Sequence, residues 1–117
     1  MNKEYFLHRG QTSGQYDFWR YGTSLGKKLD DLEVQSILSN IENKDHLGSI
    51  LDIGCGTGYH LKKVSEKRSF DQFVGIDYSD SYIKKARTNF SNAEFVVGSY
   101  EKIKKIDFKS ELSHVLM

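Results

Sequence analysis

Apolar positions along this chain form short runs separated by helical patterns, and the alternation predicts the order of the elements. Ile50, Leu51 and Ile53 form one run that is typical of a buried strand, and residues 73–76 form a second. Between the two runs, residues 59–67 place Leu61 and Val64 on one face of a predicted helix. The pattern therefore predicts a strand, a helix and a second strand in the middle of the chain.

The same pattern extends in both directions. Residues 24–43 have apolar side chains at helical spacing, and residues 80–89 form another predicted helix with Ser79 as its N-cap. Residues 93–97 and 112–117 are predicted strands, whereas residues 1–22 are polar and aromatic without clear periodicity. This order predicts an α/β fold, a Rossmann-like parallel sheet of about four strands with right-handed crossovers. We expect one domain, with an N-terminal helical segment at 1–46 and a βαβ core at 47–117.

The loop after the first strand carries the clearest chemical signal. Residues 50–58 read ILDIGCGTG, with glycine at 54, 56 and 58 and with Asp52 inside the strand. The second strand ends in Asp77, and an acid about 20 residues beyond a glycine loop can accept hydrogen bonds from the hydroxyls of a ribose. The following helix directs free N–H groups toward the loop. This arrangement predicts a nucleoside site at the carboxyl edge of the sheet.

The spacing of the glycines separates two classes of nucleoside cofactor. The dinucleotide fingerprint G-x-G-x-x-G would need glycine at position 59, where this chain has Tyr59. A nicotinamide cofactor is therefore the less favoured hypothesis. The segment instead resembles the first motif of the class I, Rossmann-like S-adenosylmethionine (SAM) methyltransferases, D-x-G-x-G-x-G. Residues 75–87, GIDYSDSYIKKAR, resemble the second motif of that family. The resemblance covers residues from about 47 to the C-terminus and implies SAM binding and methyl transfer.

The resemblance also implies roles for individual residues. Asp77 would bind the ribose and Tyr78 would flank the adenine, whereas Gly98-Ser99-Tyr100 replaces a common G-D-A sequence, so Ser99 would be a neutral partner for the adenine amino group. The fourth strand of the family commonly opens with F-D, and the corresponding place here reads Ser113-His114, so His114 replaces the usual acid. No catalytic residue and no metal ligand is predicted. The predicted cofactor-binding residues are Asp52, Gly54, Cys55, Gly56, Gly58, Asp77, Tyr78, Ser99 and Tyr100.

Several of these residues have a second, purely structural interpretation. Asp52 either reaches the amino group of the cofactor or orients the glycine loop, and the residues favour neither. Cys55 lacks an activating neighbour and is interpreted as a small loop residue, and His60 as an exposed helix residue. The aromatic cluster of Tyr16, Phe18, Trp19 and Tyr21 is interpreted as packing rather than as a lid, and the lysine-rich helix faces as solvated.

Composition restricts the partners and the compartment. The chain has 117 residues, a formal net charge of +1 and one cysteine, Cys55. The balanced charge argues against a nucleic-acid or membrane partner, and a single cysteine excludes an internal disulfide. The sequence has no apolar run long enough for a signal peptide or a membrane span. A small-molecule acceptor and a cytoplasmic location are expected.

Two functional hypotheses remain open. The chain is either the cofactor-binding portion of a SAM-dependent methyltransferase, or a non-catalytic SAM-binding or interaction module, such as a truncated domain or half of a two-chain enzyme. It ends at Met117 within the predicted fourth strand, before the segments that usually bind the acceptor. We therefore expect cofactor binding without turnover, and a homodimer through the exposed fourth strand.

Overall fold

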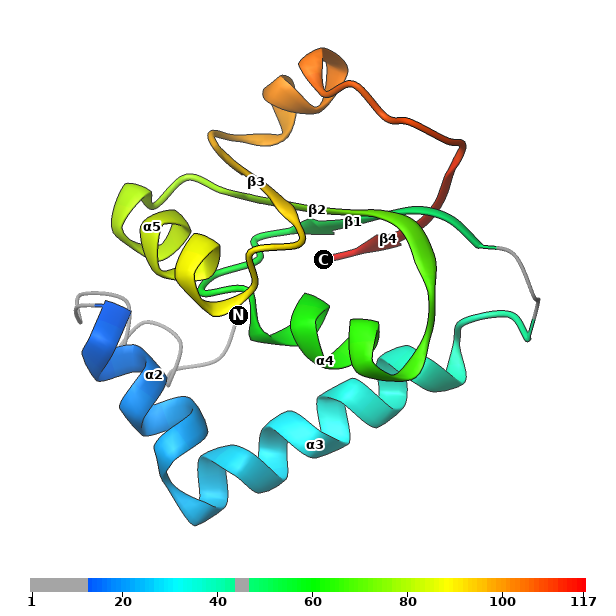
Figure 1. The fold of residues 1–117 in the computed structure, drawn as a ribbon. Coiled ribbons are helices and arrows are strands. Elements are labelled where there is room, and N and C mark those ends of the chain that lie inside the picture. The colour runs from blue at the N-terminus through cyan, green and yellow to red at the C-terminus, as the bar shows by residue number, and fades with distance from the viewer. Residues whose placement is uncertain (1–12, 44–46) are drawn as a thin grey trace.

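The structure is a computed structural model that describes residues 13–43 and 47–117 (Figure 1). Its elements, in chain order, are α2 (Ser13–Gly22), α3 (Ser24–Ser39), β1 (Leu47–Ile53), α4 (Tyr59–Lys67), β2 (Phe70–Asp77), α5 (Asp80–Asn89), β3 (Glu94–Val97), the 3-10 helix η1 (Tyr100–Lys105) and β4 (Leu112–Leu116). Within these residues no helix combines the length and the apolar character that crossing a membrane requires.

The four strands form one parallel sheet in the order β3-β2-β1-β4. The central strand β1 pairs with both neighbours, so that Leu51 lies between Val74 of β2 and Val115 of β4. Because β1 and β2 are adjacent and parallel, the loops that follow them lie side by side at the carboxyl edge of the sheet. The predicted α/β class and parallel four-stranded sheet are confirmed.

The helices form layers on the sheet (Figure 1). Helices α4 and α5 cover one face, α3 runs along the outer side of α4, and α2 lies at the end near α5. Helix η1 and the coil after it lie across the opposite face. The N-terminal helices therefore meet the core on the face that carries α4 and α5.

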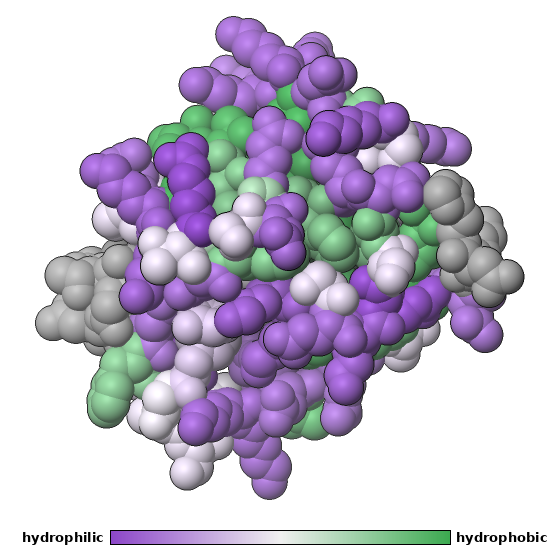
Figure 2. Space-filling model, in the orientation of Figure 1, coloured by the Kyte–Doolittle hydropathy of each residue, from purple (hydrophilic) through white to green (hydrophobic). Residues whose placement is uncertain are grey.

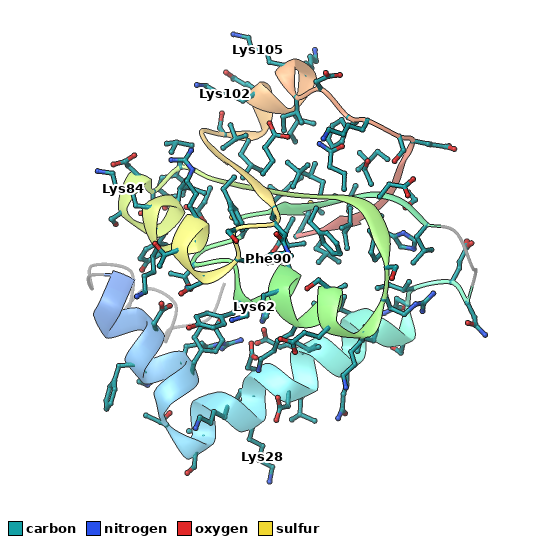
Figure 3. The ribbon with its side chains drawn as sticks, in the orientation of Figure 1. Lys28, Lys62, Lys84, Phe90, Lys102 and Lys105 are labelled. Atoms are coloured by element: carbon teal, nitrogen blue, oxygen red, sulfur yellow. The ribbon has the colours of Figure 1, made fainter. Side chains whose placement is uncertain are left out.

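The main hydrophobic core lies between the sheet and helices α4 and α5. Ile50, Leu61, Val64 and Ile83 are completely buried there. The ring of Phe90, which follows α5, packs edge-on against Phe73 with the ring centroids 5.5 Å apart, and Figure 3 shows Phe90 between α4 and the sheet. The residues predicted to face the core from these two helices are buried, as expected.

A smaller core covers the opposite face of the sheet. Its buried residues are Leu51, Val74 and Ile76, against which Ile103 and Ile106 pack. Figure 2 shows hydrophobic surface beneath the hydrophilic side chains of the η1 region. Lys102 and Lys105 of η1 and Lys84 of α5 point away from the body of the molecule (Figure 3). Lys84 belongs to a helix face that the charge pattern predicts to be solvated, whereas Lys63, from the other predicted face, is only 29% exposed and pairs with Asp30.

The N-terminal helices differ most from the sequence-based expectation. Helix α2 lies in the segment that lacks periodicity, and α3 ends at Ser39 rather than near residue 43. Thr23 separates the two helices, because its hydroxyl accepts a hydrogen bond from the N–H of Gly26 and donates one to the carbonyl of Trp19. Phe18 is 71% exposed, so this member of the aromatic cluster does not pack into the core. The side chain of Tyr16 lies outside the described residues.

The two edge strands of the sheet, β3 and β4, differ in what covers them. At β3, the guanidinium of Arg87 donates a hydrogen bond of 3.0 Å to the carbonyl of Phe95. At β4, Val115 is 50% exposed and Met117 is 97% exposed. Strand β4 therefore presents the more apolar edge.

Candidate functional site: the carboxyl edge of the sheet

The glycine loop after β1 has open space over its first half and close packing under its second. Gly54 and Gly56 have φ angles of 77° and 57°, and a Cβ on either would meet no atom of residues 13–43 or 47–117 within 4 Å. A Cβ on Gly58 would lie 2.9 Å from Cζ of Phe95 and 3.1 Å from Cβ of Ala86. The first two glycines therefore leave the main chain accessible to a ligand, whereas Gly58 allows α4 to pack against α5 and β3.

Hydrogen bonds to β2 hold the loop in place. The N–H groups of Gly54 and Cys55 both donate to the carbonyl of Ile76, at 2.8 and 3.0 Å. The N–H of Gly56 donates to Oδ2 of Asp77 at 3.0 Å, and the N–H of Ser79 donates to Oδ1 at 2.9 Å. Asp77 therefore joins the loops after β1 and β2. A carboxylate has about four acceptor positions, so Asp77 can still accept hydrogen bonds from a ligand.

Asp52 lies inside β1 below this loop and is only 6% exposed. The pKa of Asp52 is raised to about 7, mainly because burial disfavours the charged carboxylate; the charge of His60 opposes this rise and the charge of Asp77 adds to it. Its carboxylate accepts no hydrogen bond from the part of the chain that the structure describes, and the loop amides bond to Ile76 and Asp77 instead. Asp52 is thus a buried acid without a hydrogen-bond donor of its own among these residues.

Cys55 contributes its backbone to the loop and its side chain to the core. The thiol is free and buried, and a Cβ on Gly75 would approach its Sγ to 2.8 Å. Burial raises the pKa of the thiol, and the charges of Asp52 and Asp77 raise it further. A nucleophilic thiolate is therefore disfavoured, in agreement with the structural interpretation of Cys55.

The remaining predicted site residues lie on neighbouring strand ends. Tyr78 follows β2 and is 58% exposed, and Ser99 is exposed after β3. The N–H of Gly98 donates to the carbonyl of Asp77 at 2.9 Å, which places the β2 and β3 ends together. The side chain of Tyr100 lies outside the described part of the chain.

His114, unlike the predicted cofactor-binding residue Asp77, does not lie next to the glycine loop. In β4 it pairs in register with Ile50, two residues before the level of Asp52. Its ring packs edge-on against Phe70 at 5.4 Å. His114 is therefore a packing residue of the strand, away from the glycine loop.

A cluster of charged side chains beside the site was not anticipated from the sequence. Completely buried Asp30 of α3 lies 2.8 Å from Nε2 of His60 and also pairs with Lys63 of α4. Glu33 lies 3.1 Å from Nε2 of His60 and pairs with Arg20 of α2. The interpretation of His60 as an exposed residue is wrong, because its side chain is only 26% exposed and lies between two carboxylates.

The electrostatics of this cluster follow from its pairing. Burial acts to raise the pKa of Asp30, but His60 and Lys63 together lower it. Burial acts to lower the pKa of His60, but Asp30, assisted by Asp52 and Glu33, raises it. The cluster thus favours the charged forms of Asp30 and His60. It also joins α2 and α3 to the helix that begins at the glycine loop.

The loop, the acids and the strand order match a known family. A family model described as "Methyltransferase domain" matches residues 44–114. The chain belongs to this methyltransferase family. The family predicted from the D-x-G-x-G-x-G motif is therefore confirmed.

Solved structures support the same assignment of this methyltransferase domain. The plantazolicin methyltransferase BamL, solved in complex with a triazolic desmethylPZN analog and SAH, is 27% identical. It has a TM-score of 0.59, and the match covers 93% of this chain and 41% of that one. An S-adenosylmethionine-dependent methyltransferase from Clostridium acetobutylicum ATCC 824 is 18% identical and shares the fold, with a TM-score of 0.52 over 96% of this chain and 42% of the other.

A curated protein also matches in sequence. The highly reducing polyketide synthase bet1 of Neocamarosporium betae is 31% identical over 88 residues, which are 74% of this chain and 3% of that protein. The match thus spans less than half the length of each of these proteins.

Proposed function

We propose that this methyltransferase domain binds SAM at the carboxyl edge of its sheet and presents it for methyl transfer. The observation that carries the proposal is the open main chain of Gly54 and Gly56 next to the carboxylate of Asp77. This site has the features that a nucleoside cofactor requires, namely an exposed loop, a helix N-terminus and an acid at the next strand end. The presence of SAH in the BamL complex supports the same cofactor class.

The site residues have different roles in this proposal. Asp77 accepts hydrogen bonds from the ribose with the lone pairs that Gly56 and Ser79 leave free. Tyr78 flanks the adenine and Ser99 is a neutral partner for its amino group, while Tyr100 stays a predicted cofactor-binding residue. Gly54, Gly56 and Gly58 allow close approach of the cofactor, and Cys55 contributes only its main chain because its thiol faces the core.

Asp52 is assigned to the amino group of the cofactor. The alternative role, orientation of the loop, has less support because the loop amides bond to Ile76 and Asp77. An ammonium next to a buried carboxylate compensates its charge and would lower its raised pKa.

The chemistry of the domain follows from its cofactor. The sulfonium of SAM makes the methyl group electrophilic, so the protein must mainly hold it in line with an acceptor. We propose a small molecule as the acceptor, and the domain at 1–117 as the cofactor-binding portion, with 1–46 as its helical segment and 47–117 as its core. The alternative is a SAM-binding module without catalysis, which the partial coverage of the matched proteins keeps open. A cytoplasmic location fits the single free thiol, Cys55.

Calorimetry with SAM, SAH and NAD on one preparation tests the proposal. We expect binding of SAM and SAH and no binding of NAD, because position 59 is tyrosine and does not complete a dinucleotide loop. Binding of NAD alone would contradict the assignment. A radiolabelled-methyl assay then separates the two classes, and we expect binding without turnover from the 117-residue chain. Multiple turnovers with any acceptor would show that the chain is catalytic by itself.

We further propose that the chain forms a twofold dimer through β4. The support is the apolar edge at Val115 and Met117, which has neither proline nor dense charge to prevent pairing with another strand. A closed twofold pair is the commonest form of assembly.

A further inference from the structure

Asn89, the last residue of α5, connects three segments that lie far apart in the sequence. Its Nδ2 donates a hydrogen bond of 2.9 Å to the carbonyl of Thr57, which lies in the glycine loop. The same Nδ2 donates to Oδ2 of Asp17 in α2, at 3.4 Å. Both neighbours are acceptors, so the orientation of the amide is determined by its surroundings. Asn89 therefore uses its two N–H groups on two different elements.

The carbonyl that Asn89 holds belongs to the peptide between Thr57 and Gly58. The N–H on the other side of that peptide, from Gly58, donates to the carbonyl of Cys55 at 3.1 Å. Both polar groups of this peptide are therefore restrained. Gly58 precedes α4 with φ 82°, and its carbonyl accepts the hydrogen bond from Lys62 that begins the helix. The orientation of this peptide determines where the first N–H groups of α4 point.

Helix α2 is attached to the same region by further contacts. The ring of Tyr21 lies against the ring of Tyr59, with centroids 4.0 Å apart, at the first residue of α4. Arg20 pairs with Glu33 of α3, which holds α2 against its neighbour. Figure 1 shows α2 at the end of the sheet where the glycine loop lies. Helix α2 thus contacts the start of α4 directly and the loop through Asn89.

We propose that Asn89 is a positioning residue that fixes the Thr57–Gly58 peptide and so increases cofactor affinity. The inference rests on the proposed binding of SAM or SAH at this loop. Asn89 does not touch the cofactor in this proposal, and it acts through the backbone of the loop. Its contribution depends on donation by the amide and not on the volume of the side chain.

Asn89→Asp separates donation from packing, because the carboxylate has nearly the same shape. It cannot donate to Thr57, and it places a negative charge beside Asp17. We expect the SAH dissociation constant of Asn89→Asp to rise about tenfold, as for the loss of one to two hydrogen bonds. Thr88→Ala is the matched control, because the exposed hydroxyl of Thr88 bonds to Lys84 within α5. Its affinity should equal that of the wild-type chain.

The double variant Asp17→Asn with Asn89→Asp separates positioning from stability. Asn at 17 can donate to Asp at 89, so the link between α2 and α5 re-forms, but Thr57 still lacks its donor. We expect the thermal midpoint to recover while SAH affinity stays low. Wild-type-like affinity of Asn89→Asp with the fold intact by circular dichroism, or recovery of affinity in the double variant, would overturn the inference.

Amide hydrogen exchange in the chain without cofactor gives a readout that does not depend on SAH. In Asn89→Asp the N–H of Gly58 should exchange faster, whereas the N–H of Leu51 in β1 should not change. Equal exchange at Gly58 in the two proteins would also overturn the inference. Failure of the wild-type chain to bind SAH would instead refute the proposed function, with the exchange result still deciding whether Asn89 holds the loop.

Discussion

At the scale of single residues, two acids at the carboxyl edge are in opposite situations. Asp77 already accepts two backbone N–H groups, so it stabilises the folded loop before any ligand arrives. Asp52 is buried with a pKa raised to about 7 and accepts no hydrogen bond from the described residues. One acid is therefore part of the scaffold, and the other carries a cost that a bound cation can relieve.

Asp77→Asn should weaken SAH binding by about 1.5–3 kcal/mol, the usual effect of losing hydrogen bonds to a charged acceptor. The amide also cannot accept from both Gly56 and Ser79, so the loop becomes less rigid. Calorimetry measures the affinity. Asp80→Asn is the control, since Asp80 is exposed and forms an ion pair with Lys84 of its own helix. Unchanged affinity in Asp77→Asn, with the fold intact, would rule out the ribose contact.

Asp52→Asn should remove a pH dependence of stability. The pKa of Asp52 is raised in the folded chain to about 7, so the folded state holds this proton more tightly than the unfolded state does. Its contribution is present at low pH and is lost as pH rises toward 7, with a slope of about 1.4 kcal/mol per pH unit for one proton. Urea unfolding between pH 5 and 7 measures the slope. An identical slope in Asp52→Asn and wild type would contradict this account.

At the scale of elements, the helices next to the sheet were predictable and the N-terminal pair was not. Helices α4 and α5 have the predicted bounds, and Ser79 caps α5 by accepting from the N–H of Tyr82. Helix α2 has glycine at two of its ten positions and aromatic side chains without a helical stripe. Its stability comes from packing on α3 and α5, which only the folded chain provides.

The residues of the candidate site were likewise only partly predictable from the sequence. The glycine loop and Asp77 are visible in the sequence because local spacing determines them. Asn89 and the Asp30–His60 pair are not visible, because α3, α4 and α5 bring together residues that are far apart in the chain. The first residues of β2 were not predicted as strand, because this end of the strand is partly polar. Its Gln72 accepts hydrogen bonds from Ser49 and from the N–H of Lys109.

Asp30→Ala should cost about 3 kcal/mol of stability at pH 6, because it leaves His60 and Lys63 without their buried partner. The pKa of His60 is raised in the folded chain, so this pairing is fully present below about pH 6.5 and is lost as pH rises through the raised value. The loss in Asp30→Ala should therefore shrink at higher pH. Chemical unfolding at pH 6 and pH 9 measures both effects.

Asp31→Asn is the matched control for this prediction. Asp31 also lies near Lys63, at 3.4 Å, but its side chain is 68% exposed. An exposed pair of this kind contributes little to stability. Equal losses in the two variants would mean that burial of Asp30 is not what makes the cluster stabilising.

At the scale of the whole molecule, the exposed edge of β4 predicts association. We expect light scattering at micromolar concentration to give the mass of a dimer, and Val115→Lys to give a monomer, because the added charge prevents strand pairing. Leu25→Lys is the control, since Leu25 is 61% exposed on α3, away from β4. A wild-type monomer, or a dimer unaffected by Val115→Lys, would exclude this interface.

The hydrogen bond from Arg87 to the carbonyl of Phe95 has a consequence for how far such association can go. Addition of strands at both ends of a sheet leads to open-ended fibrils, as in cross-β aggregates. Here the guanidinium of Arg87 occupies one backbone acceptor of the edge strand β3, which disfavours the addition of a strand there. In the proposed dimer the two β4 edges pair with each other, so the assembly stays finite. Replacement of Arg87 is expected to free the Phe95 carbonyl and to favour further strand addition at β3.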